Sequence, residues 1–148
     1  MIELYKEYLS ELEKYTPEPF EEGTAEEAIK FYKKNRIDTK LIFSDGKLVG
    51  FLIVSTLPYC HPECDYFICQ SYLKPEYRGK GLMTGAVVEW VKAHPGKYCL
   101  DIIFGNKHAK SFWYRRFWEL GYIGIELPFY EHGVTGVCET LGFRPKFS

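Results

Sequence analysis

The 148-residue sequence contains no long hydrophobic run, no internal repeat and no low-complexity tract. No segment approaches the roughly 20 apolar residues of a membrane-spanning helix, and the acidic, amphipathic start of the chain does not have the pattern of a signal peptide. The five cysteines are odd in number and lack the spacing of a disulfide scaffold, which predicts reduced thiols. These absences predict a cytoplasmic protein that does not act at a membrane.

Net charge is nearly absent as well. The formal charge of −1 gives no global reason to expect nucleic acid as a partner. Apolar residues make up 46% of the chain and aromatic residues 18%, so the chain is globular and not disordered. A chain of this length buries about two-thirds of its unfolded surface. We therefore expect a single domain that spans residues 1–148.

A metal centre has little support in the sequence. Cys60, His61 and Cys64 lie close together in a predicted loop. A structural zinc site needs four ligands, however, and no second paired cluster follows. We interpret these cysteines as unpaired loop thiols and predict no metal.

The stretch 73–84, with the sequence LKPEYRGKGLMT, joins a predicted strand at 65–73 to a predicted helix. Four apolar residues recur on one face of that helix: Met83, Val87, Trp90 and Val91. A glycine-containing turn at such a junction leaves backbone N–H groups free at the positive end of the helix dipole, where phosphate binds. The spacing fits neither the Walker loop nor the Rossmann turn.

The spacing of Arg78, Gly81 and Met83 instead resembles the R/Q-x-x-G-x-G/A turn of the GNAT acetyltransferases, which cradles the pyrophosphate of acetyl-CoA. Residues 106–113, NKHAKSFW, follow a second predicted strand at 97–104 and resemble the N-x-x-A-x-x-[FL]-[YW] start of the last GNAT helix. The sequence is closest to a GNAT subgroup with Phe-Trp on a longer last helix. The two motifs stand in the expected order, and the resemblance covers residues 40–125 well.

The resemblance implies an α/β fold: a mixed, mostly antiparallel sheet with a central, splayed parallel strand pair, flanked by helices. The strand–helix–strand order over 65–104 also predicts a parallel pair with a right-handed crossover. In such sheets ligands bind beyond the carboxyl ends of the strands, here Leu73 and Phe104. By resemblance, the pantetheine arm of acetyl-CoA lies in the gap between these strands.

Acetyl-CoA is thus the expected co-substrate. Gly79 and Gly81 would let the backbone approach the pyrophosphate, and Arg78 and Lys80 would add positive charge. Carried over by position, the cofactor-binding residues are Leu73, Arg78, Gly79, Lys80, Gly81, Leu82, Met83, Thr84, Asn106, Lys110 and Trp113. Trp113 either packs on the cofactor arm or fills the core.

The two ends of the chain fit the family pattern poorly. A helix that begins near Ile2 takes the place of the usual first strand, and Thr24 opens a second helix with a capping box. Residues 1–30 hold nine Glu against three Lys. These acids either form a solvated helix face or, as the resemblance suggests, attract a cationic amine. A hairpin with an Asp45-Gly46 turn is predicted near the start of the sheet, and residues 122–141 are predicted to form a closing hairpin that ends before Gly142-Phe143.

Acetyl transfer to an amine needs a base, because such an amine is mostly protonated at neutral pH. The candidates are Glu63, Asp65, Asp101 and His61, or a water held by Gln70 or Ser71. Distance along the strands favours Asp101 over Asp65, with Ser71 holding a relay water; a structural role for Asp101 is the alternative. Trp113 replaces the family's usual tyrosine acid, so the acid is unassigned. We expect a small-molecule or peptide amine as acceptor, and a homodimer is compatible with the family. The alternatives are a non-catalytic acyl-CoA-binding or sensor module of the same fold, and an unrelated small-ligand-binding domain.

Overall fold

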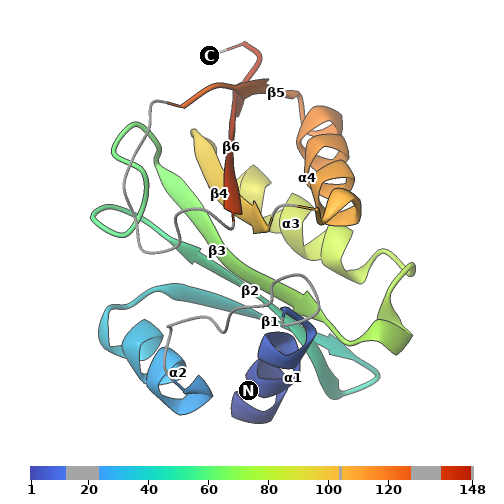
Figure 1. Cartoon of the computed structure of the whole chain (residues 1–148). Coiled ribbons are helices and arrows are strands. Elements are labelled where there is room, and N and C mark those ends of the chain that lie inside the picture. Colours follow the sequence, from blue (N-terminus) through green and yellow to red (C-terminus); the bar gives the residue numbers. More distant parts are fainter. Residues whose placement is uncertain (13–23, 104, 128–137, 148) are drawn as a thin grey trace.

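The structure is a computed structural model, and it describes residues 1–12, 24–103, 105–127 and 138–147. A six-stranded sheet in the order β1-β2-β3-β4-β6-β5 forms the centre (Figure 1). The strands are β1 (Asp38–Ser44), β2 (Lys47–Ser55), β3 (Tyr66–Leu73), β4 (Tyr98–Ile103), β5 (Tyr122–Ile125) and β6 (Cys138–Pro145). The helices are α1 (Ile2–Leu12), α2 (Ala25–Lys34), α3 (Leu82–Ala93) and α4 (Lys107–Glu119), with a short 3-10 helix η1 (Pro75–Tyr77). The predicted fold class is confirmed.

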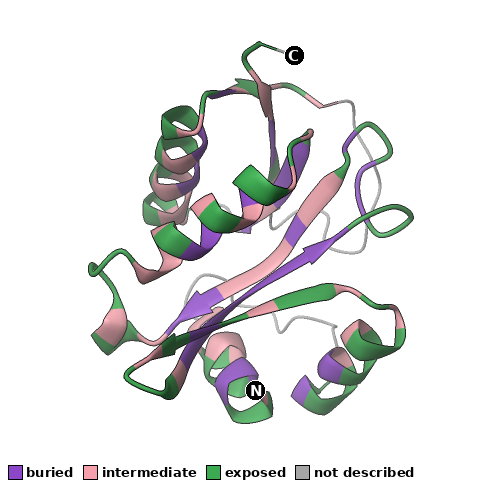
Figure 2. Cartoon of the chain, turned by 180° about the vertical axis from the view of Figure 1, so that it is seen from behind, coloured by how far each residue is buried: buried purple, intermediate pink, exposed green. Residues whose placement is uncertain are grey.

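Helices α1 and α2 cover one face of the sheet, and α3 and α4 cover the other (Figure 1). Tyr5 of α1 is fully buried and stacks on Phe51 of β2 with ring centroids 5.6 Å apart. On the opposite face, Phe117 of α4 stacks on Phe143 of β6 at 4.2 Å. Strand β2 lies between the two layers and is buried along most of its length (Figure 2), which explains its nearly continuous apolar sequence.

The Thr24 cap and the Asp45-Gly46 turn are confirmed. Thr24 is the N-cap of α2, and its hydroxyl accepts a hydrogen bond from the Glu27 amide at 3.2 Å. Asp45 and Gly46 have φ values of 50° and 78°, as the type I′ turn between β1 and β2 requires. No helix in the described ranges is long and apolar enough to cross a membrane.

Strands β3 and β4 are parallel, as predicted, but they pair over only three positions, Tyr66–Ile68 with Tyr98–Leu100. The β2–β3 register shifts here, because Ile53 pairs with Gln70 and Val54 with Ile68, which leaves Cys69 as an extra residue on β3. Such a bulge bends its strand. Beyond the bulge β3 continues along β2 to Leu73, while β4 continues along β6. The predicted splay is therefore present, and the bulge is its local cause.

The closing strands correct one prediction. Strand β6 does not end before Gly142-Phe143 but runs through both residues to Pro145, and it lies between β4 and β5. Gly142 lies within the strand and allows Leu127 to approach closely. A Cβ at Gly142 would lie 2.8 Å from Leu127 Cγ. The middle of the predicted closing hairpin, residues 128–137, and the strand end at Phe104 lie outside the described residues.

Candidate active site

The bulge divides the side chains of β3 between the two faces of the sheet. Gln70 faces α1, where its amide oxygen accepts a hydrogen bond from the Tyr8 hydroxyl, and Tyr72 packs in the same layer. Ser71 pairs with Leu52, which packs on the α3 side, and Leu73 packs beside Ala86 of α3. In the described part of the sheet, no strand pairs with this half of β3 on the side of β4. An extended ligand can therefore hydrogen-bond to that edge as an added strand would.

The turn after β3 leads directly into the N-terminus of α3. Gly79 and Gly81 have φ values of 80° and 81°, a left-handed conformation that favours glycine. Gly81 is the N-cap of α3 and offers no side chain to cap the helix. A Cβ built at either glycine would meet nothing within 4 Å, so the outer side of the turn is open. The first amides of α3, in residues 82–84, thus lie at an open helix N-terminus, the arrangement that the predicted phosphate site requires.

The side chain of Arg78 does not add its charge to this opening. Its Nε donates to the Leu73 carbonyl at 2.8 Å, its Nη2 lies 2.7 Å from a Glu11 carboxylate oxygen, and its guanidinium covers the Tyr72 ring at 5.5 Å. Arg78 therefore ties the end of β3 to α1. Lys80 remains exposed at the turn, with its ammonium over the Tyr77 ring at 5.6 Å.

Ion pairs neutralise most of the acidic groups on α1 and α2. Glu11 pairs with Arg78, and Glu7 lies 3.7 Å from Lys74. Glu3 and Glu26 both pair with Lys6. Among the described acidic residues of these two helices, Glu27 alone has no ion pair. For the five described acids of these helices the structure favours a solvated, paired helix face; the other four Glu of residues 1–30 lie outside the described residues.

The second predicted cofactor motif, at the start of α4, is used differently. Asn106 is the N-cap of α4, and its side-chain oxygen accepts a hydrogen bond from the Ala109 amide at 3.1 Å. Lys110 pairs with Glu139 at 3.0 Å. Trp113 is only 5% exposed and packs in the core beside Phe117. Of the two roles expected for Trp113, its surroundings fit the one in which it fills the core.

Arg116 is a residue that sequence reasoning missed. It reaches from α4 to the first turn of α3, where its Nη1 donates to the Thr84 hydroxyl at 2.7 Å. Its guanidinium also lies 3.5 Å from Glu119 and 5.2 Å from the Phe112 ring centroid. Its Nε is buried, and no hydrogen-bond partner lies within the described structure. The sequence does not show whether an arginine on a helix points to solvent or toward a neighbouring helix. Only the arrangement of α3 and α4 therefore identifies this contact.

The two predicted catalytic residues are not brought together. Asp101 lies between Leu100 and Ile102, which pack on the α3 side, so its carboxylate points to the α1 side and Ser71 points away from it. The Asp101 carboxylate accepts a hydrogen bond from the Thr140 hydroxyl at 2.7 Å. Ser71 therefore faces the opposite side of the sheet from the Asp101 carboxylate. Gln70, which accepts a hydrogen bond from the Tyr8 hydroxyl, faces the same side of the sheet as Asp101.

Other candidate groups have structural partners. The Asp65 carboxylate accepts from the Lys97 amide at 2.8 Å and joins the two strand starts. Burial raises the pKa of Tyr72, and the nearby Glu11 and Glu7 carboxylates add to this effect. Burial likewise raises the pKa of Cys60 to about 11, so this thiol stays protonated at neutral pH. No cluster that could hold a metal ion occurs among the residues that the structure describes.

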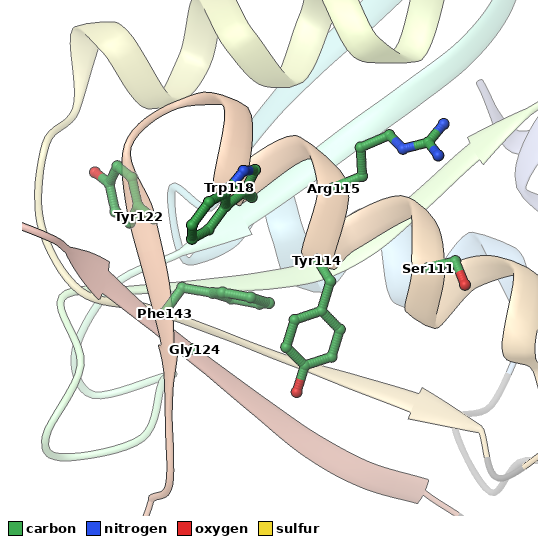
Figure 3. Close-up of a pocket in the computed structure, with 7 residues that line it drawn as sticks. All are labelled: Ser111, Tyr114, Arg115, Trp118, Tyr122, Gly124 and Phe143. Atoms are coloured by element: carbon green, nitrogen blue, oxygen red, sulfur yellow. The ribbon is translucent and has the colours of Figure 1, made fainter.

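A cavity of about 500 Å³ lies elsewhere, between α4 and the β5–β6 edge (Figure 3). Its lining residues are Ser111, Tyr114, Arg115, Trp118, Tyr122, Gly124 and Phe143. None of them belongs to the turn at 78–84 or to β3. The cavity is therefore a separate feature from the splayed strands and the open start of α3.

The six-stranded mixed sheet, its splayed parallel pair and the flanking helices define an α/β domain of the GNAT-like fold class. The family model described as "Acetyltransferase (GNAT) family" matches residues 2–122. This chain therefore belongs to the GNAT acetyltransferase family, as the two motifs predicted. Membership of a Phe-Trp subgroup remains a prediction.

Solved structures show the same fold at low sequence identity. An acetyltransferase from Thermus thermophilus is 18% identical with a TM-score of 0.63, over 97% of this chain and 85% of that one. A ribosomal-protein-alanine N-acetyltransferase from Brucella melitensis is 11% identical with a TM-score of 0.59, over 92% and 87%. Diaminobutyrate acetyltransferase from Paenibacillus lautus, in complex with L-2,4-diaminobutyric acid and coenzyme A, is 16% identical with a TM-score of 0.59, over 74% and 71%. Among curated proteins, none matches this sequence.

Proposed function

We propose that this protein is an acetyl-CoA-dependent N-acetyltransferase that moves the acetyl group directly to an amine. The observation that carries the proposal is the open N-terminus of α3, which follows directly from the unpaired end of β3. Members of this family use acetyl-CoA as the donor. The open glycine turn before α3, where no side chain stands in the way, suits its pyrophosphate. In this proposal the amides of 82–84 bind the pyrophosphate, and Lys80 adds charge.

The pantetheine arm would lie along the free edge of β3, from Cys69 to Leu73. An arm that hydrogen-bonds to this edge brings the acetyl thioester to the bulge, where β3 leaves β4. The Leu73 carbonyl already accepts from Arg78, so one of its two lone pairs is in use and one is free. Holding the thioester in place beside the amine supplies much of the catalytic advantage of such a site.

Asp101 is the proposed general base, and Gln70 replaces Ser71 as the group that holds the relay water. Both side chains lie on the α1 side of the splay. The amine nitrogen would attack the thioester carbonyl carbon and pass its proton through the water to the Asp101 carboxylate. The C–S bond then breaks, and the departing thiolate takes a proton from a donor such as the Tyr8 hydroxyl on the same face.

The acceptor is proposed to be an amine of low charge, either a small molecule or the N-terminus of a peptide. Similar folds include an enzyme with a diamino acid bound and one named for a ribosomal protein alanine. The ion pairs of Glu7 and Glu11 with Lys74 and Arg78 leave little net charge on the α1 wall. Selection of a polycation by this wall would need unpaired carboxylates.

Release of free CoA thiol from acetyl-CoA, measured with a panel of amines, tests the proposal. The panel should include 2,4-diaminobutyrate, an alanyl peptide and spermidine. We expect at least one monoamine or peptide to be acetylated, with no advantage for spermidine. If acetyl-CoA binds and no amine accelerates thiol release, the chain is a non-catalytic acyl-CoA-binding module instead.

The base assignment is tested with the accepted amine. Asp101→Asn should lower the turnover rate by about 10²–10⁴ while the acetyl-CoA affinity stays unchanged. Asp65→Asn is the matched control, because it removes a carboxylate of the same sheet that only bonds a backbone amide. Equal loss of rate in both variants, or full activity in a folded Asp101→Asn protein, would remove Asp101 from the mechanism.

A further inference from the structure

The cavity between α4 and the β5–β6 edge is an aromatic slot with one polar end. Trp118 and Tyr122 lie at one end, Tyr114 and Phe143 between, and Arg115 at the other end near Ser111 (Figure 3). Phe143 forms a rigid floor, since it is 1% exposed and stacks on Phe117. A volume of about 500 Å³ falls within the range of small-molecule sites, roughly 300–1,000 Å³.

The aromatic walls are unusually accessible to solvent. Trp118 is 67% exposed and Tyr114 is 44% exposed, although both rings belong to a helix that packs on the sheet. Gly124 keeps the slot open, because a Cβ at this position would lie 3.1 Å from the Tyr114 ring. Rings held in this way offer planar surfaces for stacking, and indole is the best of them for such contacts.

The charged residue in the described lining of the slot is Arg115. Within the described structure, Arg115 has no ion pair and the Ser111 hydroxyl has no hydrogen bond. At the other end the Lys146 ammonium lies 5.9 Å from the Trp118 ring centroid. No carboxylate lines the cavity among the described residues. The Arg115 guanidinium suits a carboxylate, because its fork can donate two parallel hydrogen bonds to one.

We propose that this slot binds a small planar aromatic carboxylate, with its ring against Trp118 and Tyr114 and its carboxylate on Arg115 and Ser111. The site is distinct from the acetyl-CoA site, since the two share no residue. It does not depend on the proposed function: the slot can bind its ligand whether or not the chain turns over acetyl-CoA. It is the chemistry of the lining, an aromatic slot with one cationic end, that selects this class of ligand.

Isothermal titration calorimetry with indole-3-carboxylate as the probe tests the site, with the neutral indole-3-carboxamide as its uncharged counterpart. We expect the carboxylate to bind about tenfold more tightly than the amide at low salt, as a charge-assisted hydrogen bond implies. Arg115→Gln should remove this difference while weak ring binding remains. Gly124→Val should block both probes, because its side chain would fill the slot. Lys92→Gln, which removes an exposed cation at the far end of α3, is the matched control and should change neither affinity.

Several outcomes would overturn the proposal. They are equal binding of the two probes, no binding of either at millimolar concentration, and tighter binding of the carboxylate that survives Arg115→Gln. Sedimentation of the unliganded protein provides a further check. If the chain forms a dimer that Trp118→Ala dissociates, the aromatic surface is an interface between copies and not a ligand site. Acetyl-CoA affinity should be the same in every slot variant, which separates failure here from failure of the acetyl-CoA site.

Discussion

The N-termini of α3 and α4 have the same place in the fold, since each follows a strand of the splayed parallel pair, yet they differ in their capping. At α4 the Asn106 side-chain oxygen accepts a hydrogen bond from the Ala109 amide at 3.1 Å, so one of the free N–H groups at the helix start already has a partner. At α3 the N-cap is Gly81, which has no side chain and leaves the end open. Thr24 caps α2 in the same way as Asn106 caps α4. An anion can therefore bind at α3 without displacing a cap.

This difference assigns separate tasks to two motifs that look equally functional in the sequence. Both were expected to contact acetyl-CoA. In the structure, the turn before α3 combines positive φ values with open space. The motif at α4 instead fixes a helix whose Trp113 and Phe117 build the core. We infer that α3 provides the anion site and that the α4 motif mainly positions the helix beside it.

The largest expected effect comes from closing the open end. Gly81→Val should abolish the stabilisation by acetyl-CoA, which is about 2.7 kcal/mol at a hundred times the dissociation constant. Gly46→Val is the matched control, because Gly46 has a similar φ of 78° and equally open surroundings in a hairpin turn. Both variants carry similar backbone strain, so denaturant unfolding with and without acetyl-CoA isolates the ligand effect. If acetyl-CoA still stabilised the Gly81→Val variant, the open N-terminus of α3 would not be the anion site.

The next effect concerns the contact that joins the two helices. Thr84→Val removes the acceptor of the half-buried Arg116 guanidinium and should lower the free energy of unfolding by about 1–3 kcal/mol. Thr84→Ser keeps the hydroxyl and should lose much less. Urea unfolding of the two variants measures the difference. Equal stability of the two would show that the hydroxyl contact does not matter.

Removing the cap of α4 should have a smaller effect, and one confined to stability. Asn106→Ala should lower the free energy of unfolding by about 1 kcal/mol, because the Ala109 amide loses its acceptor. Thr24→Ala at α2 should behave alike. We expect the acetyl-CoA dissociation constant to change by less than about twofold in either variant. A tenfold weaker affinity in Asn106→Ala alone, about 1.4 kcal/mol, would return Asn106 to the cofactor site.

The smallest effect on stability is expected for the Glu11–Arg78 ion pair, which joins α1 to the turn before α3. Glu11→Gln should cost about 0.2–1 kcal/mol of stability, because the Glu11–Arg78 pair is partly exposed. It should also release Arg78, so that acetyl-CoA binding becomes stronger and more sensitive to salt, which screens exposed charges over about 10 Å at 0.1 M. Glu3→Gln, on the same helix but paired only with Lys6, is the control. Unchanged salt dependence in Glu11→Gln would mean that Arg78 does not reach the cofactor.

The sequence predicted those features that depend on local chemistry. The Asp45-Gly46 turn, the Thr24 cap and the glycine turn before α3 all follow from residue types at fixed spacing. Arg78, Arg116 and Asp101 were placed less well, because their partners are far away in the chain: Glu11, Thr84 and Thr140. The face to which Ser71 points depends on the bulge at Cys69, which shifts the alternation of the strand by one residue. No pattern within β3 announces that bulge.

Mapping the backbone amide signals during a titration with acetyl-CoA tests the central claim most directly. If the open end of α3 is the anion site, the largest shifts will fall on residues 79–84 and on the free edge of β3 at 69–73. The Ala109 amide, which Asn106 already caps, should shift little. Large shifts at Ala109 with little change at 82–84, or shifts confined to the Trp118 cavity, would contradict the account.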